Sequence, residues 1–384
     1  MNARKLTVTS IAAVLGTVGA SAQIPDLVNA LDAGGRAMGM GGGIYTAGAD
    51  TMSGLNNPAG LGFLTEPQIG LAFRNLPESA TRLERDFRDP LVTTDAESGT
   101  RALSHAGLVI PLKRSGGRTA GTVSVAYTLG GFIRDERTGT DLRDGNLTVR
   151  DYFEISKIKT DYFTLSYGAA GESFAWGIGA VFTNTYIRNT QFYNVFDGNN
   201  NGVGNVNVDN RGNQTGIGGV VGVQFIPRGS NLSVGLSYRT PIDLRGAEEV
   251  ASYYDRIPGK LSGGFALRSD GLRGGKDFLV YGAQVDAYFG GKKDSILERK
   301  DQVAIGGGFE YNYRFGNSFV PFRLGYRWVP SGGDGFFFGD RETLTFGFGY
   351  RPFGGRFSAD LNFATTSDGG GWDVALGLNY RLGN

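Results

Sequence analysis

The chain of 384 residues has no cysteine and only one histidine, His105. The absence of cysteine excludes a disulfide framework and every metal site built on thiolates. A single histidine leaves no multi-histidine metal site, and a Ser-His nucleophilic site could use only His105. The glycine-rich stretch 39–43 lacks the Lys-Ser/Thr of a phosphate-binding loop. We therefore expect no cofactor, no metal and no enzymatic activity.

An excess of charge of one sign and long apolar runs are also missing. The formal net charge is +1, so nothing indicates a nucleic acid or another bulk electrostatic partner. Beyond the N-terminal region, no apolar run reaches the roughly 20 residues that a transmembrane helix needs. A hydropathy reading would class such a chain as soluble, but the same reading misses membrane barrels because their strands alternate.

The N-terminus has the features of a secretory signal. Arg4 and Lys5 form a positive region, residues 8–18 are apolar or small, and Ala20-Ser21-Ala22 supplies the small-x-small cleavage pattern. The apolar run is too short for a membrane anchor. We expect residues 1–22 to be removed as a signal peptide, which leaves Gln23 as the first mature residue.

What the chain does have is glycine, aromatics and a hydrophobic period of two. It contains 64 glycines, and 12% of its residues are aromatic. Glycine at this level opposes helices and suits closely approaching strands and turns. In 372–382, bulky apolar residues occupy every second position, and Asp, Ala, Gly, Asn and Arg lie between them. The bulky face recurs from strand to strand, while the other face mixes glycine, hydroxyls and full charges, which is typical of a lumen.

Segments long enough to cross the hydrocarbon layer number fourteen, an even number as closed bacterial barrels require. They lie near 67–74, 104–113, 118–130, 159–169, 174–187, 214–226, 231–240, 259–268, 278–289, 302–315, 319–329, 343–353, 356–365 and 372–382. Short and long connections take turns between them, except that the last outer connection, 366–371, is short. The prediction is an all-β fold: residues 67–384 form a 14-stranded antiparallel transmembrane β-barrel in the cell outer membrane.

By strand parity, several charged side chains should point into the lumen. They are Arg239, Arg268, Arg314, Arg323, Arg327, Arg351 and Arg381, with Asp286, Glu310, Asp360 and Asp373. One interpretation is that some of the arginines bind a substrate carboxylate. The other is mutual pairing that stabilises the lumen and holds a plug in place.

Residues 23–66 lack strand alternation and are rich in glycine and other small residues. A segment of this kind ahead of a barrel either trails into the periplasm or folds inside the lumen. A fourteen-stranded lumen is too wide for wall side chains alone to fill. We therefore expect residues 23–66 to form an N-terminal hatch, or plug, inside the barrel.

Two stretches of this sequence resemble a known family. Gly35–Gly42 (GRAMGMGG), followed by Asn57-Pro58-Ala59-Gly60-Leu61, is similar to the hatch of the FadL-type outer-membrane transporters of hydrocarbons and long-chain fatty acids. Val234–Pro241 (VGLSYRTP) is a second resemblance. The hatch-motif residues are Gly35, Arg36, Met38, Gly39, Gly41, Asn57, Pro58 and Ala59. PorV-like barrels, which are related to this family, share the motif.

The resemblance implies passive uptake of hydrophobic compounds. In that family a substrate enters an apolar groove among the extracellular loops, moves into the barrel, and leaves sideways through a gap in the wall as the hatch shifts. The groove uses the third and fourth long loops, and the sixth loop here adds another aromatic cluster. Candidate substrate-binding residues are Phe192, Tyr193, Phe196, Val250, Tyr253, Tyr254, Phe336, Phe337 and Phe338. The alternative is that these side chains pack the loops against one another.

The wall gap of that family lies at a kink in the third strand, and Gly130 and Gly131 interrupt the corresponding strand here. Expected partners are an apolar small molecule or lipid, outer-membrane lipids and lipopolysaccharide, and the barrel-assembly machinery during biogenesis.

Residues 197–202 match the first half of a calcium-binding loop. The twelfth position of that pattern is Val208 instead of an acidic residue, so a flexible Asn/Gly loop is expected.

Two other functions remain open. A PorV-like secretion scaffold should associate tightly with a secreted or periplasmic protein. A diffusion porin for polar solutes should pass a large steady current in a planar bilayer, whereas a plugged barrel should not.

Overall fold

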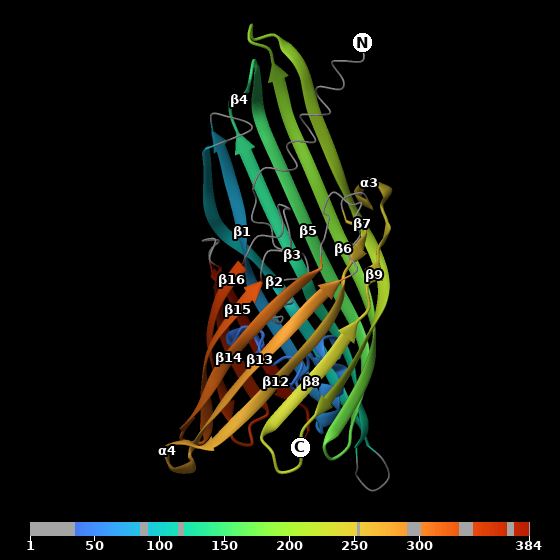
Figure 1. Cartoon of the computed structure of the whole chain (residues 1–384), viewed down its shortest axis with the longest axis vertical. Coiled ribbons are helices and arrows are strands. Elements are labelled where there is room, and N and C mark those ends of the chain that lie inside the picture. Colours follow the sequence, from blue (N-terminus) through green and yellow to red (C-terminus); the bar gives the residue numbers. More distant parts are fainter. Residues whose placement is uncertain are drawn as a thin grey trace.

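A computed structural model describes residues 35–84, 91–113, 119–251, 254–289, 301–329, 341–366 and 372–383. Fourteen strands form one closed antiparallel ring, which β7 and β8 close by pairing with each other (Figure 1). In chain order they are β1 (Gln68–Glu84), β2 (Leu91–Lys113), β3 (Thr119–Gly139), β5 (Leu147–Ala170), β6 (Phe174–Phe196), β7 (Gly202–Phe225), β8 (Leu232–Arg239), β12 (Gly259–Gly271), β13 (Asp277–Phe289), β14 (Gln302–Phe315), β15 (Ser318–Val329), β16 (Arg341–Pro352), β17 (Phe357–Thr366) and β18 (Trp372–Arg381). The predicted fold class and strand number are confirmed.

Short elements complete the fold. The strands β4 (Leu142–Asp144) and β10 (Arg245–Gly246) pair with β5 and β7, and β9 (Ile242–Asp243) pairs with β11 (Arg256–Ile257). The helices are η2 (Met38–Met40), α2 (Ser53–Asn56), η3 (Pro58–Phe63), α3 (Glu248–Ala251) and α4 (Leu272–Gly275). In the part of the chain that the structure describes, no helix is both long and apolar enough to cross a membrane.

Strand alternation separates an apolar outer face from a polar inner face. On β15 the outward side chains of Phe322, Leu324 and Tyr326 are 50%, 42% and 45% exposed, while the inward Arg323 and Arg327 are only 4% and 1% exposed. Similar large apolar side chains are exposed on neighbouring strands around the ring. Such a continuous apolar surface is stable when it faces lipid.

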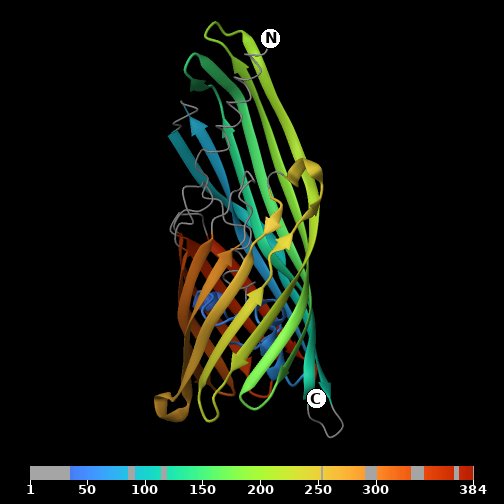
Figure 2. The ribbon, with the colours of Figure 1, turned by 45° about the vertical axis from the view of Figure 1, so that its right-hand side comes forward.

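The two sides of the ring differ in height. The strands β1, β2, β3, β5, β6 and β7 continue well beyond the ends of the shorter strands, and β5 and β7 reach 24 residues where β17 and β18 have 10 (Figures 1 and 2). The outer parts of β3, β5, β6 and β7, at 129–139, 147–161, 185–196 and 202–215, are called the extended wall here. The sequence-based strand ranges left 75–103, 131–158 and 188–213 as long connecting loops, and this was wrong because most of these residues form paired strands.

The opposite end of the ring, called the turn end here, carries short connections. These include 171–173, 316–317 and 353–356, and Gly316 and Gly354 have φ angles of 56° and 63° that side-chain-bearing residues rarely adopt. Bacterial barrels place their short turns on the periplasmic side. By that rule the turn end faces the periplasm and the extended wall projects outward.

Candidate functional site

Residues 35–64, called the luminal segment here, lie inside the ring, and Figure 1 shows them between its walls near the turn end. The Asn-Pro motif fixes the middle of this segment. The side chain of Asn57 donates to the carbonyl of Thr46 at 2.7 Å and to that of Val223 on β7 at 3.1 Å, and it accepts from the backbone of Ala59 at 3.1 Å. Pro58 then opens η3, where its missing N–H costs no hydrogen bond.

Glycines on both sides let the luminal segment lie directly on the wall. Gly41 has a φ of 65° and donates its N–H to the hydroxyl of Thr345 at 2.9 Å. A Cβ added at Gly41 would lie 2.4 Å from the carbonyl oxygen of Tyr326. A Cβ at Gly325 would lie 2.2 Å from the carbonyl carbon of Met40. Any side chain at either position would push the segment off the strands.

A buried charge cluster ties the luminal segment to β14, β15, β16 and β17. Glu310 is fully buried and accepts hydrogen bonds from Arg36 at 2.8 and 2.9 Å and from Arg323 at 2.7 Å. Arg323 also donates to Asp360 at 2.6 Å, and Arg351 lies 3.4 Å from Glu310. Because each of these buried charges has a partner of opposite sign, their attraction offsets the free-energy cost of removing the charges from water.

The other inward charges are mostly paired as well. Arg327 pairs with Asp286, and Arg74 pairs with Asp373. Mutual pairing therefore accounts for Arg323 and Arg327. Three of the arginines predicted to point inward lie near the turn end and are exposed instead of buried in the lumen: Arg268, Arg314 and Arg381.

Above the luminal segment, the inner face of β5, β6 and β7 carries a lower apolar cluster. Its buried residues are Leu55, Ile158, Tyr162, Val181, Ile187, Val220, Ile242, Leu244, Val250, Tyr254 and Ile257. Five of these come from the connection between β8 and β12, which folds inward onto β7. It can do so because β7 has glycine beneath it: a Cβ at Gly216 or Gly218 would approach Ile242 to 2.5 or 2.6 Å.

An upper apolar cluster continues along the extended wall. Its buried residues are Leu142, Val149, Tyr152, Tyr193, Val195 and Val206. Between the two clusters Glu154 accepts from the hydroxyl of Tyr152 at 2.6 Å and from the amide of Gln191 at 2.9 Å, with Arg137 at 3.9 Å. Burial, and then the nearby Glu154 charge, raise the pKa of Tyr152. The tyrosine is therefore a neutral donor, and the carboxylate is satisfied between two apolar regions.

Beside the lower apolar cluster, the backbone pairing of the wall is interrupted between β2 and β3, and this interruption is called the parting here. Pairing of these strands ends at His105 and Thr128, and in the described registers residues 129–134 pair with β5 but not with β2. Gly130 is a bulge, since the register against β5 shifts between Leu129 and Gly131. Apolar side chains fill the parting, namely Leu76, Leu129 and Phe132, with Ala102 packed against them.

The bulge and the lower apolar cluster are in direct contact. A Cβ at Gly130 would lie 2.0 Å from Cε2 of Tyr162. The guanidinium of Arg239 lies over the same ring, 5.0 Å from its centroid, and Arg239 is 3% exposed. A cation, an aromatic ring and the kinked strand thus form one continuous unit, which sequence reasoning could not assemble.

No family model and no curated protein matches this sequence. Solved structures do. A FadL homologue of Pseudomonas aeruginosa superposes with a TM-score of 0.58 at 15% identity, covering 96% of this chain and 100% of that one. The toluene transporter TodX of Pseudomonas putida gives a TM-score of 0.52 at 10% identity, with 89% and 96% of the two chains covered. The chain has the FadL-type fold.

In this FadL-type barrel, the predicted substrate-binding residues do not form one loop groove. Phe192, Tyr193 and Phe196 were predicted in a loop but lie in β6, where alternate residues face opposite sides. Tyr193 belongs to the upper apolar cluster, whereas Phe192 is 38% exposed on the outer face and Phe196 packs under Arg150, 4.5 Å from its guanidinium.

Two of the three fourth-loop candidates are buried instead of exposed. Val250 and Tyr254 are 0% and 2% exposed inside the lower apolar cluster. The remaining candidates lie outside the described residues: Tyr253, Phe336, Phe337 and Phe338. Of the described candidates, Val250 and Tyr254 share the lower apolar cluster and Tyr193 lies in the upper one, so a substrate-binding role stays a prediction.

The suspected calcium loop is a tight turn between β6 and β7. One oxygen of Asp197 accepts from the backbone of Asn199 at 2.9 Å and of Asn201 at 2.8 Å. The backbone and side-chain donors of Asn201 lower the pKa of Asp197. Among the described residues, no group of His, Asp and Glu side chains is placed to hold a metal ion.

Proposed function

We propose that this protein lets hydrophobic compounds, such as long-chain fatty acids or hydrocarbons, pass inward through the outer membrane by diffusion. The observation that carries the proposal is the succession of two apolar clusters on the inner wall, the upper and the lower one, between whose packed side chains an apolar solute would insert. An apolar solute gains free energy by leaving water for such surfaces, roughly 25 cal/mol per Å² buried. The structural similarity to a protein named as a toluene transporter and to a FadL homologue supports the proposal of a transporter for hydrophobic compounds.

In this proposal the luminal segment acts as a hatch and the parting between β2 and β3 acts as a lateral exit. Below the lower apolar cluster the luminal segment and its ion pairs oppose straight passage to the periplasm. Beside the cluster, the parting is filled only by side chains, so rotamer changes of Leu129 and Phe132 would open it. A sideways exit delivers an apolar solute to lipid without taking it through water.

Arg239 gives a reason to include carboxylates among the substrates. Its guanidinium lies at the edge of the lower apolar cluster and stacks on Tyr162. A fatty acid there would place its chain on the apolar wall and its carboxylate against a guanidinium, which is a strong, charge-assisted contact. A porin for polar solutes has no use for such a wall, and no observation here favours a secretion scaffold.

Uptake by a deletion strain tests the proposal. Cells complemented with the wild-type chain should take up radiolabelled oleate or toluene faster than cells with the empty vector. Gly130→Val should abolish the gain, because the added atoms meet Tyr162 and close the parting. Gly263→Val is the matched control, since the nearest atom to a Cβ there is Cδ1 of Leu236 at 3.5 Å. Equal uptake of every apolar compound with and without the protein would contradict the proposal.

A further inference from the structure

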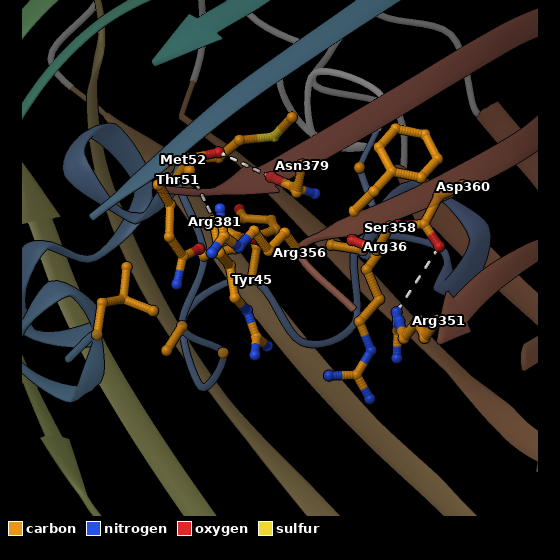
Figure 3. Close-up of a pocket in the computed structure, with 18 of the residues that line it drawn as sticks. Arg36, Tyr45, Thr51, Met52, Arg351, Arg356, Ser358, Asp360, Asn379 and Arg381 are labelled. Carbon is orange, nitrogen blue, oxygen red and sulfur yellow. Dashed lines mark hydrogen bonds and ion pairs between the residues drawn. The ribbon is translucent and has the colours of Figure 1, made fainter. Parts of the chain in front are cut away.

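A cavity of about 320 Å³ lies on the other side of the luminal segment, toward the turn end (Figure 3). Its lining combines the luminal segment with the turn-end parts of β16, β17 and β18. The luminal segment separates it from the lower apolar cluster, so it is not part of the proposed route. At this volume it is at the small end of ligand pockets.

Arginines dominate the charged lining of this cavity. Four arginines contribute to it and only two acids, Asp50 and Asp360, do so; the arginines are Arg36, Arg351, Arg356 and Arg381. They come from the luminal segment, β16, the turn before β17, and β18, so the fold and not local sequence brings them together. Figure 3 shows their side chains gathered around the cavity.

The acids of the cavity are occupied within the protein, whereas the guanidiniums remain partly open. Asp360 has a side chain only 4% exposed and accepts from Arg323 at 2.6 Å. Asp50 accepts from the backbone of Met52 at 2.9 Å and thus closes its own turn. By contrast, the side chains of Arg36 and Arg351 are 31% and 29% exposed although both contact the buried Glu310.

The other two arginines of the cavity, Arg381 and Arg356, are more exposed still. Arg381 reaches Glu66 only at 3.9 Å, with its side chain 59% exposed. Arg356 is exposed in the turn before β17. Each guanidinium offers a planar fork of donors that matches a carboxylate or a phosphate.

One side of the cavity is apolar. Ile44, Met52 and Leu64 of the luminal segment line it and are 3%, 7% and 8% exposed. An inorganic anion would leave this surface unused, whereas a short apolar stem would cover it.

We propose that this cavity is a second site, which binds the carboxylate or phosphate head of an amphiphile carrying a short apolar stem. The head lies among Arg36, Arg351 and Arg356, and the stem lies on Ile44 and Met52. This inference goes beyond the proposed function and does not require transport. The amphiphile is either a free molecule in the periplasm or a lipid of the inner leaflet, and the test separates these sources.

The chain has no cysteine, so one introduced thiol reports on the cavity alone. Ser358 lines the cavity, and Ser358→Cys places the reporter there. Ser173→Cys is the matched control, because it lies in another turn at the same end, beside the ion pair of Arg228 and Glu172. The purified full-length protein in non-ionic detergent is treated with an anionic and a cationic methanethiosulfonate reagent, and the ratio of the two rates is measured. Since both reagents react with the same thiol, the ratio of their rates cancels differences in intrinsic thiol reactivity between the two positions.

At Ser358→Cys the anionic reagent should be favoured about tenfold or more relative to Ser173→Cys, which is the scale expected for a few guanidiniums within several ångströms. Arg351→Gln and Arg356→Gln should each lower that preference several-fold. Arg228→Gln, which removes the same charge outside the cavity, should leave it unchanged. Arg356 is exposed in a turn, so its variant tests the proposal even if Arg351→Gln does not fold.

Octanoate should protect the introduced thiol from modification by the reagents. Octanol, which has the same apolar stem but no charged head, should not. Protection by octanoate alone indicates a free amphiphile, whereas equal protection by inorganic phosphate would show that the stem contributes nothing and would overturn the proposal. Protection by octanoate and by a short-chain phosphatidylglycerol indicates a lipid head. Equal protection by octanol, or the same rate ratio at both cysteines, would overturn the proposal.

Discussion

Replacing Glu310 by glutamine should release the luminal segment. The buried carboxylate receives two hydrogen bonds from Arg36, at 2.8 and 2.9 Å, and one from Arg323 at 2.7 Å. Removing one partner of a buried pair costs roughly 3–5 kcal/mol. The lower end applies, because Arg36 is 31% exposed and Arg323 keeps Asp360 at 2.6 Å. About 3 kcal/mol corresponds to a rise of roughly 100-fold in the undocked fraction, since 1.4 kcal/mol is a factor of ten.

Single-channel recording in planar bilayers measures this change. The wild-type barrel should be nearly silent, and Glu310→Gln should open about 100-fold more often. Arg36→Gln should do the same, and the double variant should add little because both changes break one interaction. Asp270→Asn, which breaks an exposed pair with Arg268 whose side chains are 50% and 49% exposed, is the control and should stay silent. A Glu310→Gln barrel that folds and remains as silent as the wild type refutes the reasoning.

Three further changes probe other parts of the molecule. Asn57→Ala leaves two backbone carbonyls without their donor, so channel openings should again increase, by roughly 10-fold or more from a loss of about 1–3 kcal/mol. Leu324→Arg, on the lipid-facing surface, should lower the unfolding free energy in vesicles by about 2–4 kcal/mol, whereas Leu382→Arg near the turn end should cost about 0–1 kcal/mol; equal urea midpoints would contradict the membrane placement. Tyr193→Asp on the inner face should slow oleate uptake several-fold, and Phe192→Asp on the outer face should not; the reverse order in a cell-uptake assay would sink the inner-wall route.

Strands inside the lipid could be predicted because lipid imposes one rule on all of them. Every outward side chain there must be apolar, so the period of two is strong, as in Phe322, Leu324 and Tyr326 of β15. Above the lipid that constraint ends. In β7 the valines at 206 and 208 still alternate with asparagines, but the bulky outer face is lost and the segment reads as a polar loop. The alternation was nevertheless the signal that could have found the extended wall.

The sequence predicted which side chains of the site point inward, but not which residues they pair with. Parity places Arg323 inward, yet only the register of β14 against β15 sets it directly opposite Glu310. A one-residue shift would break that pair, and sequence alone does not fix the register. The prediction that Phe192 and Tyr193 share one loop surface was wrong for a related reason. Two adjacent side chains can share a surface in a loop, but in a strand they must face opposite sides.

The glycine content explains how closely the luminal segment can lie on the wall. Where Gly325 meets Met40 and Gly177 meets Pro58, backbone lies on backbone, and a Cβ would come within 2.2 and 2.3 Å. Such contacts fix position closely but bury little apolar area, so they contribute little hydrophobic free energy. Hydrophobic free energy comes instead from side chains such as Met38, Met40 and Leu61, which are fully buried, and the directional interactions of Asn57 and Arg36 add to it. The backbone contacts at glycine thus fix where the segment lies, whereas loss of the Glu310 or Asn57 interactions would weaken its docking without removing the apolar burial.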